Sequence, residues 1–272
     1  MSFLYVVTAG ATVHKRGESF LVEGPDGKRL AEIEARRLKS AVILSSVQVT
    51  TQALAEMLEH EIELAILSGR GKLLGQLTPP LSKNIDLRLA QFDRENDSEF
   101  TLIQAKRVVL AKLENQRQVL VRHTLDEPGH QPEAANAAAA IADMLEQVEA
   151  CQDMETLRGL EGICARHYWA AFGSMLKVEG VGFTGRRKRP PPDPVNAVLS
   201  FGYVLLGSLL HSFLDGLGFD PFLGFFHTEA YGRPSLALDI LEPLRAPVVD
   251  RFTLRSFNLG VLKAEDFRPD NR

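Results

Sequence analysis

The sequence predicts an α+β protein, in which a small N-terminal β-sheet domain with one helix precedes a larger all-α-helical domain. Residues 1–78 carry short apolar runs separated by turn residues, whereas apolar residues recur at helical spacing beyond residue 84. Between these regions, the paired prolines of Thr78–Leu81 (TPPL) end both strands and helices. We therefore expect two domains, residues 1–78 and 85–272, joined by a linker at residues 79–84.

The N-terminal domain is expected to be rich in strands. The predicted strands are Leu4–Val7, Ser19–Glu23, Leu30–Ile33, Ala41–Leu44, Leu64–Leu67 and Leu73–Leu77. The segment Pro25–Lys28 (PDGK) has the chemistry of a hairpin turn between the second and third of these strands. A helix over Thr51–Glu61 interrupts the pattern, with Thr50 or Thr51 as its N-cap.

The C-terminal domain is expected to be built from helices. They are predicted at Phe100–Arg122, Glu133–Ala150, Met154–Val178 and Asp193–Leu217, with a last helix from Pro234. Pro234 suits the first helical position, where the missing N–H is not needed, and Pro243 is expected to kink or end that helix. The apolar segment Ala197–Leu214 is interrupted by polar residues, which favours a buried core helix over a membrane span.

The composition is that of an ordinary soluble globular protein, with 45% hydrophobic and 24% charged residues. The two cysteines, Cys151 and Cys164, form neither a metal-binding spacing nor a disulfide framework. The apolar start (MSFLYVVTAG) lacks a basic n-region, so we expect no signal peptide, a cytoplasmic location and no membrane partner. The net charge of -4 argues mildly against a nucleic-acid partner, although the uneven distribution of charge matters more than its sum.

A candidate site lies in the glycine-bearing segment Gly218–Arg245, which contains His227, Asp239 and Glu242. The two acids are three residues apart and share one helix face among apolar neighbours, where burial without a partner is costly. A metal ion with imidazole as a co-ligand would make that face tolerable. Each residue alone has an ordinary explanation as a core histidine, a locally bonded polar group or a solvated acid. Their occurrence together favours a site.

Glu161 forms a second candidate, because it lies between Gly159 and Gly162 in a predicted helix. Each glycine costs a helix about 1 kcal/mol relative to alanine. Close approach of a ligand or of another helix would explain the pair. In the simpler alternative, the helices pack tightly and Glu161 lies at the rim of that contact.

A third candidate is the basic run Arg186, Arg187, Lys188 and Arg189, on a loop between the two acidic segments. Four consecutive cations can bind phosphates with salt-dependent affinity. The alternative is a solvated loop.

These segments resemble the CRISPR spacer-acquisition integrase, the universal adaptation endonuclease of CRISPR systems. The matching motifs are Leu160–Gly162 (LEG), Pro191–Tyr203 (PPDPVNAVLSFGY), Gly224–His227 (GFFH) and Gly232–Asp239 (GRPSLALD). Weaker matches are Ala105-Lys106 and Lys112–Gln116 (KLENQ). The resemblance covers nearly the whole chain and implies the same arrangement of a small β domain and a larger helical domain.

The resemblance implies a divalent-metal site formed by Glu161, His227 and Glu242, with Asp239 beside them as a further catalytic residue and as the alternative third ligand. Mixed imidazole and carboxylate ligation suits Mn²⁺, whereas Mg²⁺ prefers oxygen ligands and retained waters. The implied DNA contacts are Arg186, Arg187, Lys188 and Arg189, with Arg166 and Arg233 as further candidates.

The implied activity is insertion of short duplex DNA into the CRISPR array by metal-dependent transesterification at the repeat, with hydrolytic nicking as the related reaction. The implied partners are double-stranded and branched DNA and a second copy of the chain, with dimerisation through the β domain. Two such homodimers would flank a dimer of a small ferredoxin-like adaptation partner in a heterohexamer. The alternatives are a catalytically silent DNA-binding scaffold subunit and a metal hydrolase with another substrate.

Overall fold

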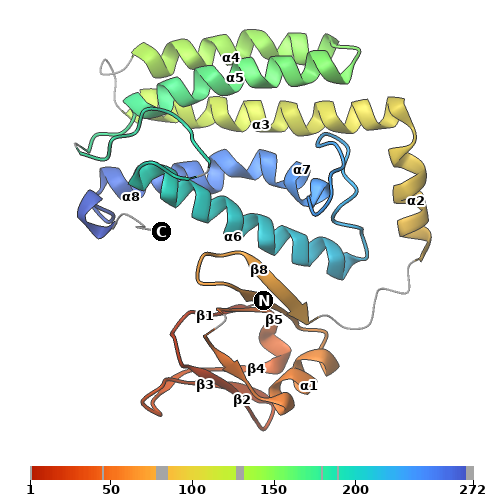
Figure 1. The fold of residues 1–272 in the computed structure, drawn as a ribbon, viewed down its shortest axis with the longest axis vertical. Helices are drawn as coiled ribbons and strands as arrows, with labels where there is room; N and C mark the ends of the chain where they lie inside the picture. Colours follow the sequence, from red (N-terminus) through yellow and green to blue (C-terminus); the bar gives the residue numbers. More distant parts are fainter. Residues whose placement is uncertain are drawn as a thin grey trace. The chain divides into compact units, whose positions relative to one another are not determined.

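The computed structural model describes residues 2–44, 46–77, 85–126, 132–178, 180–188 and 190–267 (Figure 1). The expected linker at residues 79–84 and the candidate DNA contact Arg189 lie outside these residues. The α+β class is confirmed, with strands in the N-terminal part and helices beyond. The chain forms two compact units, of which the first is Met1–Phe92 with Val204–Pro221 and the second is Asp93–Tyr203 with Phe222–Arg272. The β-sheet unit therefore also contains the second half of a helix far along the chain.

The β-sheet unit contains two four-stranded sheets, with strand orders β1-β5-β7-β8 and β4-β3-β2-β6. Its elements are β1 (Ser2–Val6), β2 (Thr12–Arg16), β3 (Ser19–Glu23), β4 (Arg29–Glu34), η1 (Ala35–Arg37), β5 (Leu38–Leu44), β6 (Gln48–Val49), α1 (Thr51–Glu59), β7 (Glu63–Leu67) and β8 (Leu73–Leu77). In the first sheet β1, β5 and β7 are parallel, and β8 pairs antiparallel with β7.

The predicted strands and α1 are confirmed to within a few residues. Thr50 is the N-cap of α1, since its Oγ1 accepts a hydrogen bond of 3.3 Å from the N–H of Ala53. The sequence analysis missed β2 and β6. In β2 (TVHKR) the only fully buried residue is Val13, so the strand carries little of the alternating apolar pattern.

The central strands β5 and β7 of the first sheet are covered on both faces, which explains their nearly continuous apolar runs. Ala41 and Ile43 of β5 enter a core shared with the second sheet and with α1. Val42 points to the other face, where the sheet packs against Leu205 and Leu209. These two leucines belong to the second half of α6 (Pro194–Leu217).

The helical unit is organised around α3 (Ser98–Asp126), which lies between the pair α4 (Pro132–Ala150) and α5 (Met154–Ser174) on one side and α7 (Ser235–Leu244) on the other (Figure 1). One stripe of α3 is buried at helical spacing. Its members are Ala105, Val109, Lys112, Leu113, Gln116, Val119 and Leu120.

Two helices were not predicted. They are α2 (Ile85–Glu95) and α8 (Arg251–Asn258). In α2 most of the apolar residues are exposed and only Gln91 is fully buried, so its pattern gives little signal. A short 3₁₀ turn, η3 (Ala264–Asp266), follows α8.

Of the two prolines of α7, Pro234 departs from the expectation and Pro243 agrees with it. Pro234 is the N-cap and the helix begins at Ser235, so the placement of Pro234 at the first helical position is wrong. The α7 helix ends at Leu244, directly after Pro243 as expected, and the chain then passes into the π-helical segment η2 (Arg245–Asp250) and into α8. The side chain of Asn115 on α3 donates a 2.9 Å hydrogen bond to the carbonyl of Pro243, so α3 supports this transition.

The expectation that the apolar segment of α6 is a buried core helix needs correction. Among the residues described, α6 is a helix long and apolar enough to cross a membrane, with a mean hydropathy of 1.7 over its best window, and only 22% of that window is buried. Its polar groups nevertheless bond to the protein. Ser208 accepts a hydrogen bond from the N–H of Leu73 and donates one to the carbonyl of Gly71. Such a helix is weak evidence for a membrane span.

Candidate metal centre

The loop before α7 is fixed by a single carboxylate. Asp239 is almost fully buried, and it accepts hydrogen bonds from the backbone N–H groups of Phe225, Phe226 and His227 at 2.6, 2.9 and 3.0 Å. A Cβ at Gly224 would lie within 2.8 Å of Asp239 Oδ2 and of Ser235, so only glycine allows this approach. The segment GFFH is thereby folded against the first turns of α7.

Asp239 also sets the orientation of the histidine. His227 Nδ1 lies 2.7 Å from Asp239 Oδ1, while His227 Nε2 faces Glu242 Oε1 at 3.7 Å, which is too far for a hydrogen bond. In a neutral imidazole, the Nδ1–H group donates a hydrogen bond to Asp239, and Nε2 carries a lone pair that is available to a ligand. A carboxylate that holds a histidine in this way is the usual outer-shell arrangement of metal sites.

The buried cation Lys112 joins the two candidate glutamates. Its ammonium group from α3 forms ion pairs with Glu161 on α5 and, at 2.7 Å, with Glu242 Oε2 on α7. That oxygen is buried and has no aligned hydrogen bond within the described part of the chain. Arg245 lies 3.1 Å from the other oxygen of Glu242. Two cations thus compensate the acids of this cluster.

The pKa values in the cluster reflect this compensation. Burial opposes the charged form of Lys112, but the charges of Glu242 and Glu161 raise its pKa above the ordinary value. Burial likewise opposes ionisation of Glu242, but Lys112 and Arg245 hold its pKa below the usual range. The lysine and Glu242 are therefore both charged at neutral pH.

The sequence analysis treated Lys112 only as a weak motif match and missed its contact with both glutamates. A signal existed, because Lys112 follows Val109 by three residues and Ala105 by seven on the buried stripe of α3. A cation in such a stripe needs a buried partner. The sequence does not show that α5 and α7 supply the partners.

The glycines beside Glu161 face open space. A Cβ at Gly159 or Gly162 would meet no described atom within 4 Å, so the explanation by tight packing of helices is wrong. On the same helix, Arg158 donates a 3.1 Å hydrogen bond to the carbonyl of Phe226. This contact connects α5 with the loop Gly224–Thr228, which we call the histidine loop, and it was not predicted from the sequence.

The basic loop is divided between two roles. Arg186 bonds to Asn196 at 2.9 Å and to Ser200 at 3.1 Å and lies over the ring of Tyr203, so it anchors the loop on α6. Arg187 and Lys188 are exposed. Partial desolvation and the charge of Arg245 lower the pKa of Lys188, and the charge of Glu242 opposes this shift.

The two other candidate arginines do not contact the cluster. Arg166 is exposed on α5, about 140° around the helix from Glu161. Arg233 bonds at 2.7 Å to the hydroxyl of Thr228 in the histidine loop. Cys164 lies near Glu161 but is not a candidate ligand. Burial, together with the smaller effect of the charge of Glu161, raises the pKa of its thiol to about 11, so the thiol stays protonated.

As the side chains stand, no group of three or more His, Cys, Asp or Glu within the described ranges is arranged to hold a metal ion. The reason is local, since the ammonium of Lys112 lies between Glu161 and Glu242. The donor set itself comprises two carboxylates and one imidazole nitrogen. Its chemistry fits a divalent cation of the Mn²⁺ type.

The fold and this cluster together define a class of α+β protein with a β-sheet unit, a helical unit and a buried carboxylate–imidazole centre in the latter. The family model for CRISPR associated protein Cas1 matches residues 4–272. The chain belongs to the Cas1 family, so the resemblance noted in the sequence is confirmed.

Curated relatives cover nearly the whole chain. It is 35% identical to CRISPR-associated endonuclease Cas1 2 of Rhodospirillum rubrum over 98% of this chain and 79% of that protein. It is 34% identical to a Cas4/Cas1 fusion of Geobacter sulfurreducens, described as an exonuclease and endonuclease, over 97% of this chain. The chain spans about half of that fusion, at 48% of its length.

Solved structures share the fold. A casposase bound to an integration product matches with a TM-score of 0.81 and 24% identity, over 100% of this chain and 77% of that one. A Cas6-RT-Cas1–Cas2 complex matches with a TM-score of 0.78 and 27% identity, over 98% of this chain and 29% of that one. A Cas1 protein from Thermotoga maritima gives a TM-score of 0.78 at 22% identity, over 100% of this chain and 84% of that one.

Proposed function

We propose that this chain is a metal-dependent DNA integrase and nuclease of CRISPR adaptation, which joins short duplex DNA to the CRISPR repeat by transesterification. One observation carries the proposal: Glu161 and Glu242 pair with the same buried cation, and His227 turns its Nε2 toward Glu242. Membership of the Cas1 family and relatives named endonucleases support it. The third possibility, a metal hydrolase of other substrates, has no comparable support.

In this proposal Glu161, His227 and Glu242 hold Mn²⁺ or Mg²⁺. Glu242 is a better third ligand than Asp239, because both oxygens of Asp239 already accept two hydrogen bonds each from the histidine loop. Asp239 then positions His227 and keeps its Nε2 turned toward Glu242.

Lys112 would act as the counter-charge of the metal-free site. Two buried carboxylates that face each other repel unless a cation lies between them, and the lysine is that cation here. A divalent ion bound by the same carboxylates would supply this charge in its place.

A bound divalent ion would polarise the phosphodiester and stabilise the charge that develops as a 3′-hydroxyl or water attacks. The protein's own groups prepare this step. Arg245 keeps Glu242 ionised, and the glycine-bearing face of α5 leaves open space beside Glu161 for a DNA strand. Arg187 and Lys188 would contact phosphates and so position the DNA without reading its sequence.

We further propose that the functional assembly contains a homodimer of this chain and a small ferredoxin-like partner, in a heterohexamer with branched or double-stranded DNA. The match to a Cas6-RT-Cas1–Cas2 complex at 27% identity supports a partner of this kind.

Strand transfer on a branched DNA substrate with Mn²⁺ tests the proposed function, with wild type compared to His227→Ala. We expect metal-dependent joining that is abolished in the variant. His167→Ala is the matched control, since it removes an exposed imidazole from α5 of the same unit and should leave joining unchanged.

The alternative is a DNA-binding scaffold subunit without catalysis. If wild type joins no DNA with Mn²⁺ and the small partner present, the scaffold function replaces the proposed one. Full activity of His227→Ala would instead refute the assignment of His227 to the site, while the proposed strand-transfer reaction would still stand.

A further inference from the structure

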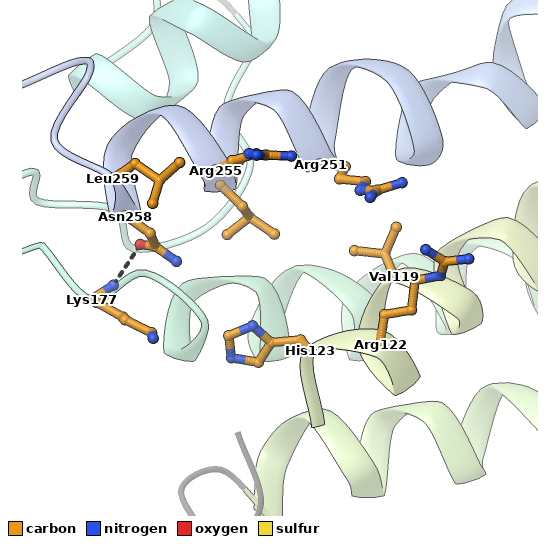
Figure 2. Close-up of a pocket in the computed structure, with 9 residues that line it drawn as sticks. Val119, Arg122, His123, Lys177, Arg251, Arg255, Asn258 and Leu259 are labelled. Carbon is orange, nitrogen blue, oxygen red and sulfur yellow. Dashed lines mark hydrogen bonds between the residues drawn. The ribbon is translucent and has the colours of Figure 1, made fainter. Parts of the chain in front are cut away.

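A second charged region of the helical unit lies away from the acidic cluster. It is a cavity of about 420 Å³ between the end of α3, the segment after α5, and α8 (Figure 2). Its lining residues are Val119, Arg122, His123, Lys177, Arg251, Leu254, Arg255, Asn258 and Leu259. We call this cavity the basic pocket. Three arginines, a lysine and a histidine border it, and no described carboxylate does.

The arginines of the basic pocket lack counter-charges. Among the described residues, the side chains of Arg122, Arg251 and Arg255 have neither an ion-pair nor a hydrogen-bond partner. All three are exposed, and they come from two different helices that face each other across the pocket (Figure 2). Clustered cations repel one another, so this arrangement of arginines lowers the stability of the helical unit when no anion is bound.

The frame of the pocket is nevertheless fixed. Asn258 on α8 accepts a 2.9 Å hydrogen bond from the backbone N–H of Lys177 and donates one of 2.9 Å to the carbonyl of Met175. These bonds tie α8 to the end of α5. The buried residues Val119 and Leu254 form an apolar floor. The pocket therefore combines a preformed apolar base with a cationic rim.

We propose that the basic pocket binds an unpaired nucleotide of a DNA strand, with its phosphate on Arg122, Arg251 and Arg255. Guanidinium groups suit phosphate oxygens because they offer paired donors in a fixed geometry. The volume is in the range of small-ligand sites. The apolar floor favours an unpaired nucleotide, since in a duplex only the backbone would reach the pocket. This inference rests on the proposed function for the identity of the ligand.

The position of the pocket fits a strand that also reaches the candidate metal centre. Arg122 follows Lys112 by about ten residues on α3, which corresponds to roughly 15 Å along the helix. The pocket would bind a strand near that centre without contributing to the chemistry.

Binding of a fluorescent single-stranded oligonucleotide in EDTA tests this inference separately from catalysis. The triple variant Arg122→Gln, Arg251→Gln and Arg255→Gln should weaken binding. The slope of log affinity against log salt should become shallower by about 0.7, because the variant no longer neutralises the one phosphate that the three arginines hold. A matched control, Arg37→Gln, Lys72→Gln and Arg107→Gln, removes three exposed cations elsewhere and should change the slope much less.

A second variant separates charge from folding. Replacing the three pocket arginines by lysine keeps the charge and should retain most of the slope, with thermal unfolding confirming the fold. The inference is overturned if the salt slope is unchanged in the glutamine triple variant, or if the slope decreases equally in the control triple variant. It is also overturned if the glutamine triple variant binds DNA normally and loses affinity only for a protein partner. The binding experiment contains no metal, so its result does not depend on catalysis. Failure of strand transfer would overturn the proposed function and leave the measured binding of the oligonucleotide unaffected.

Discussion

The acidic cluster and the basic pocket lie in the same helical unit but treat charge in opposite ways. In the cluster, Glu161 and Glu242 are compensated from within by Lys112 and Arg245. In the basic pocket the arginines have no described partner. A charge-compensated cluster is stable without a ligand, and a metal ion can bind there only by displacing the ammonium of Lys112. The uncompensated basic pocket instead gains stability from any anion that it binds. From this comparison we expect metal and DNA to bind independently.

The way each region is built also differs. Asp239 fixes His227 through three backbone hydrogen bonds, so the cluster depends on the path of the main chain. The arginines of the basic pocket extend from two helix surfaces. Small backbone changes should therefore damage the cluster more than the pocket.

The largest effect is expected for Glu242→Gln, which removes the charge of the proposed third ligand. Strand transfer should fall by about 1000-fold or more, as when a group acting on the reacting atoms is removed. Asp239→Asn should cost about 10- to 100-fold, as for a residue that orients a ligand. Metal-free DNA binding should survive in both variants. A larger decrease from Asp239→Asn would reverse the roles assigned to the two acids.

Lys112→Met should destabilise the metal-free protein by about 3 kcal/mol, because it leaves the buried Glu242 with only Arg245 and the partly buried Glu161 without its cation. Mn²⁺ should then raise the free energy of unfolding more in the variant than in wild type. Urea unfolding with and without Mn²⁺ measures both quantities. Equal stabilisation by Mn²⁺ in the two proteins would contradict competition between the lysine and a metal.

Gly224→Ala should destabilise the protein by about 1–3 kcal/mol, since the added methyl group would clash with Ser235 and Asp239. The control is Gly162→Ala, where the added methyl meets no described atom within 4 Å, so it should stabilise α5 by about 0.5–1 kcal/mol. Thermal unfolding decides between the two directions. If Gly162→Ala also lowers strand transfer, the open face of α5 is needed by the substrate.

The smallest effect concerns Asp250, at the junction of η2 and α8. It is fully buried and accepts hydrogen bonds from Tyr203 and, at 2.9 Å, from Tyr168. Burial raises its pKa despite these bonds, so the folded protein binds the proton more tightly than the unfolded chain does.

The contribution of this proton to stability is present below the pKa of the unfolded carboxyl and is lost as the pH rises through the raised native pKa. Asp250→Asn cannot titrate and should lack that decrease, so its stability relative to wild type should increase as the pH rises through this range. Urea unfolding of both proteins from pH 4 upward measures the difference. A constant difference would show that Asp250 does not titrate in this range.

Much of the fold was predictable because local signals agreed with it. The change from strand to helical periodicity near residue 80 separated the two structural regions, and Thr50 was recognisable as an N-cap. The failures have tertiary causes. The end of α7 was correctly expected near Pro243, but the sequence did not show that a π-helical segment, with Asn115 bonded to the carbonyl of Pro243, carries the chain on into α8.

The candidate centre was predictable in part. The spacing of Asp239 and Glu242 indicated a shared helix face, and their joint occurrence with His227 indicated a site. Spacing could not show that Asp239 is occupied by backbone N–H groups, nor that Lys112 on α3 lies between Glu161 and Glu242. The basic pocket was invisible for the same reason, since α3, α8 and the segment after α5 form it only after folding.

The central claim is that Glu161, His227 and Glu242 form a divalent-metal site, and calorimetric titration with Mn²⁺ tests it most directly. Wild type should show a specific, saturable site that is abolished in Glu242→Gln and retained in His167→Ala. Unchanged Mn²⁺ affinity in Glu242→Gln, with the fold intact, would contradict it.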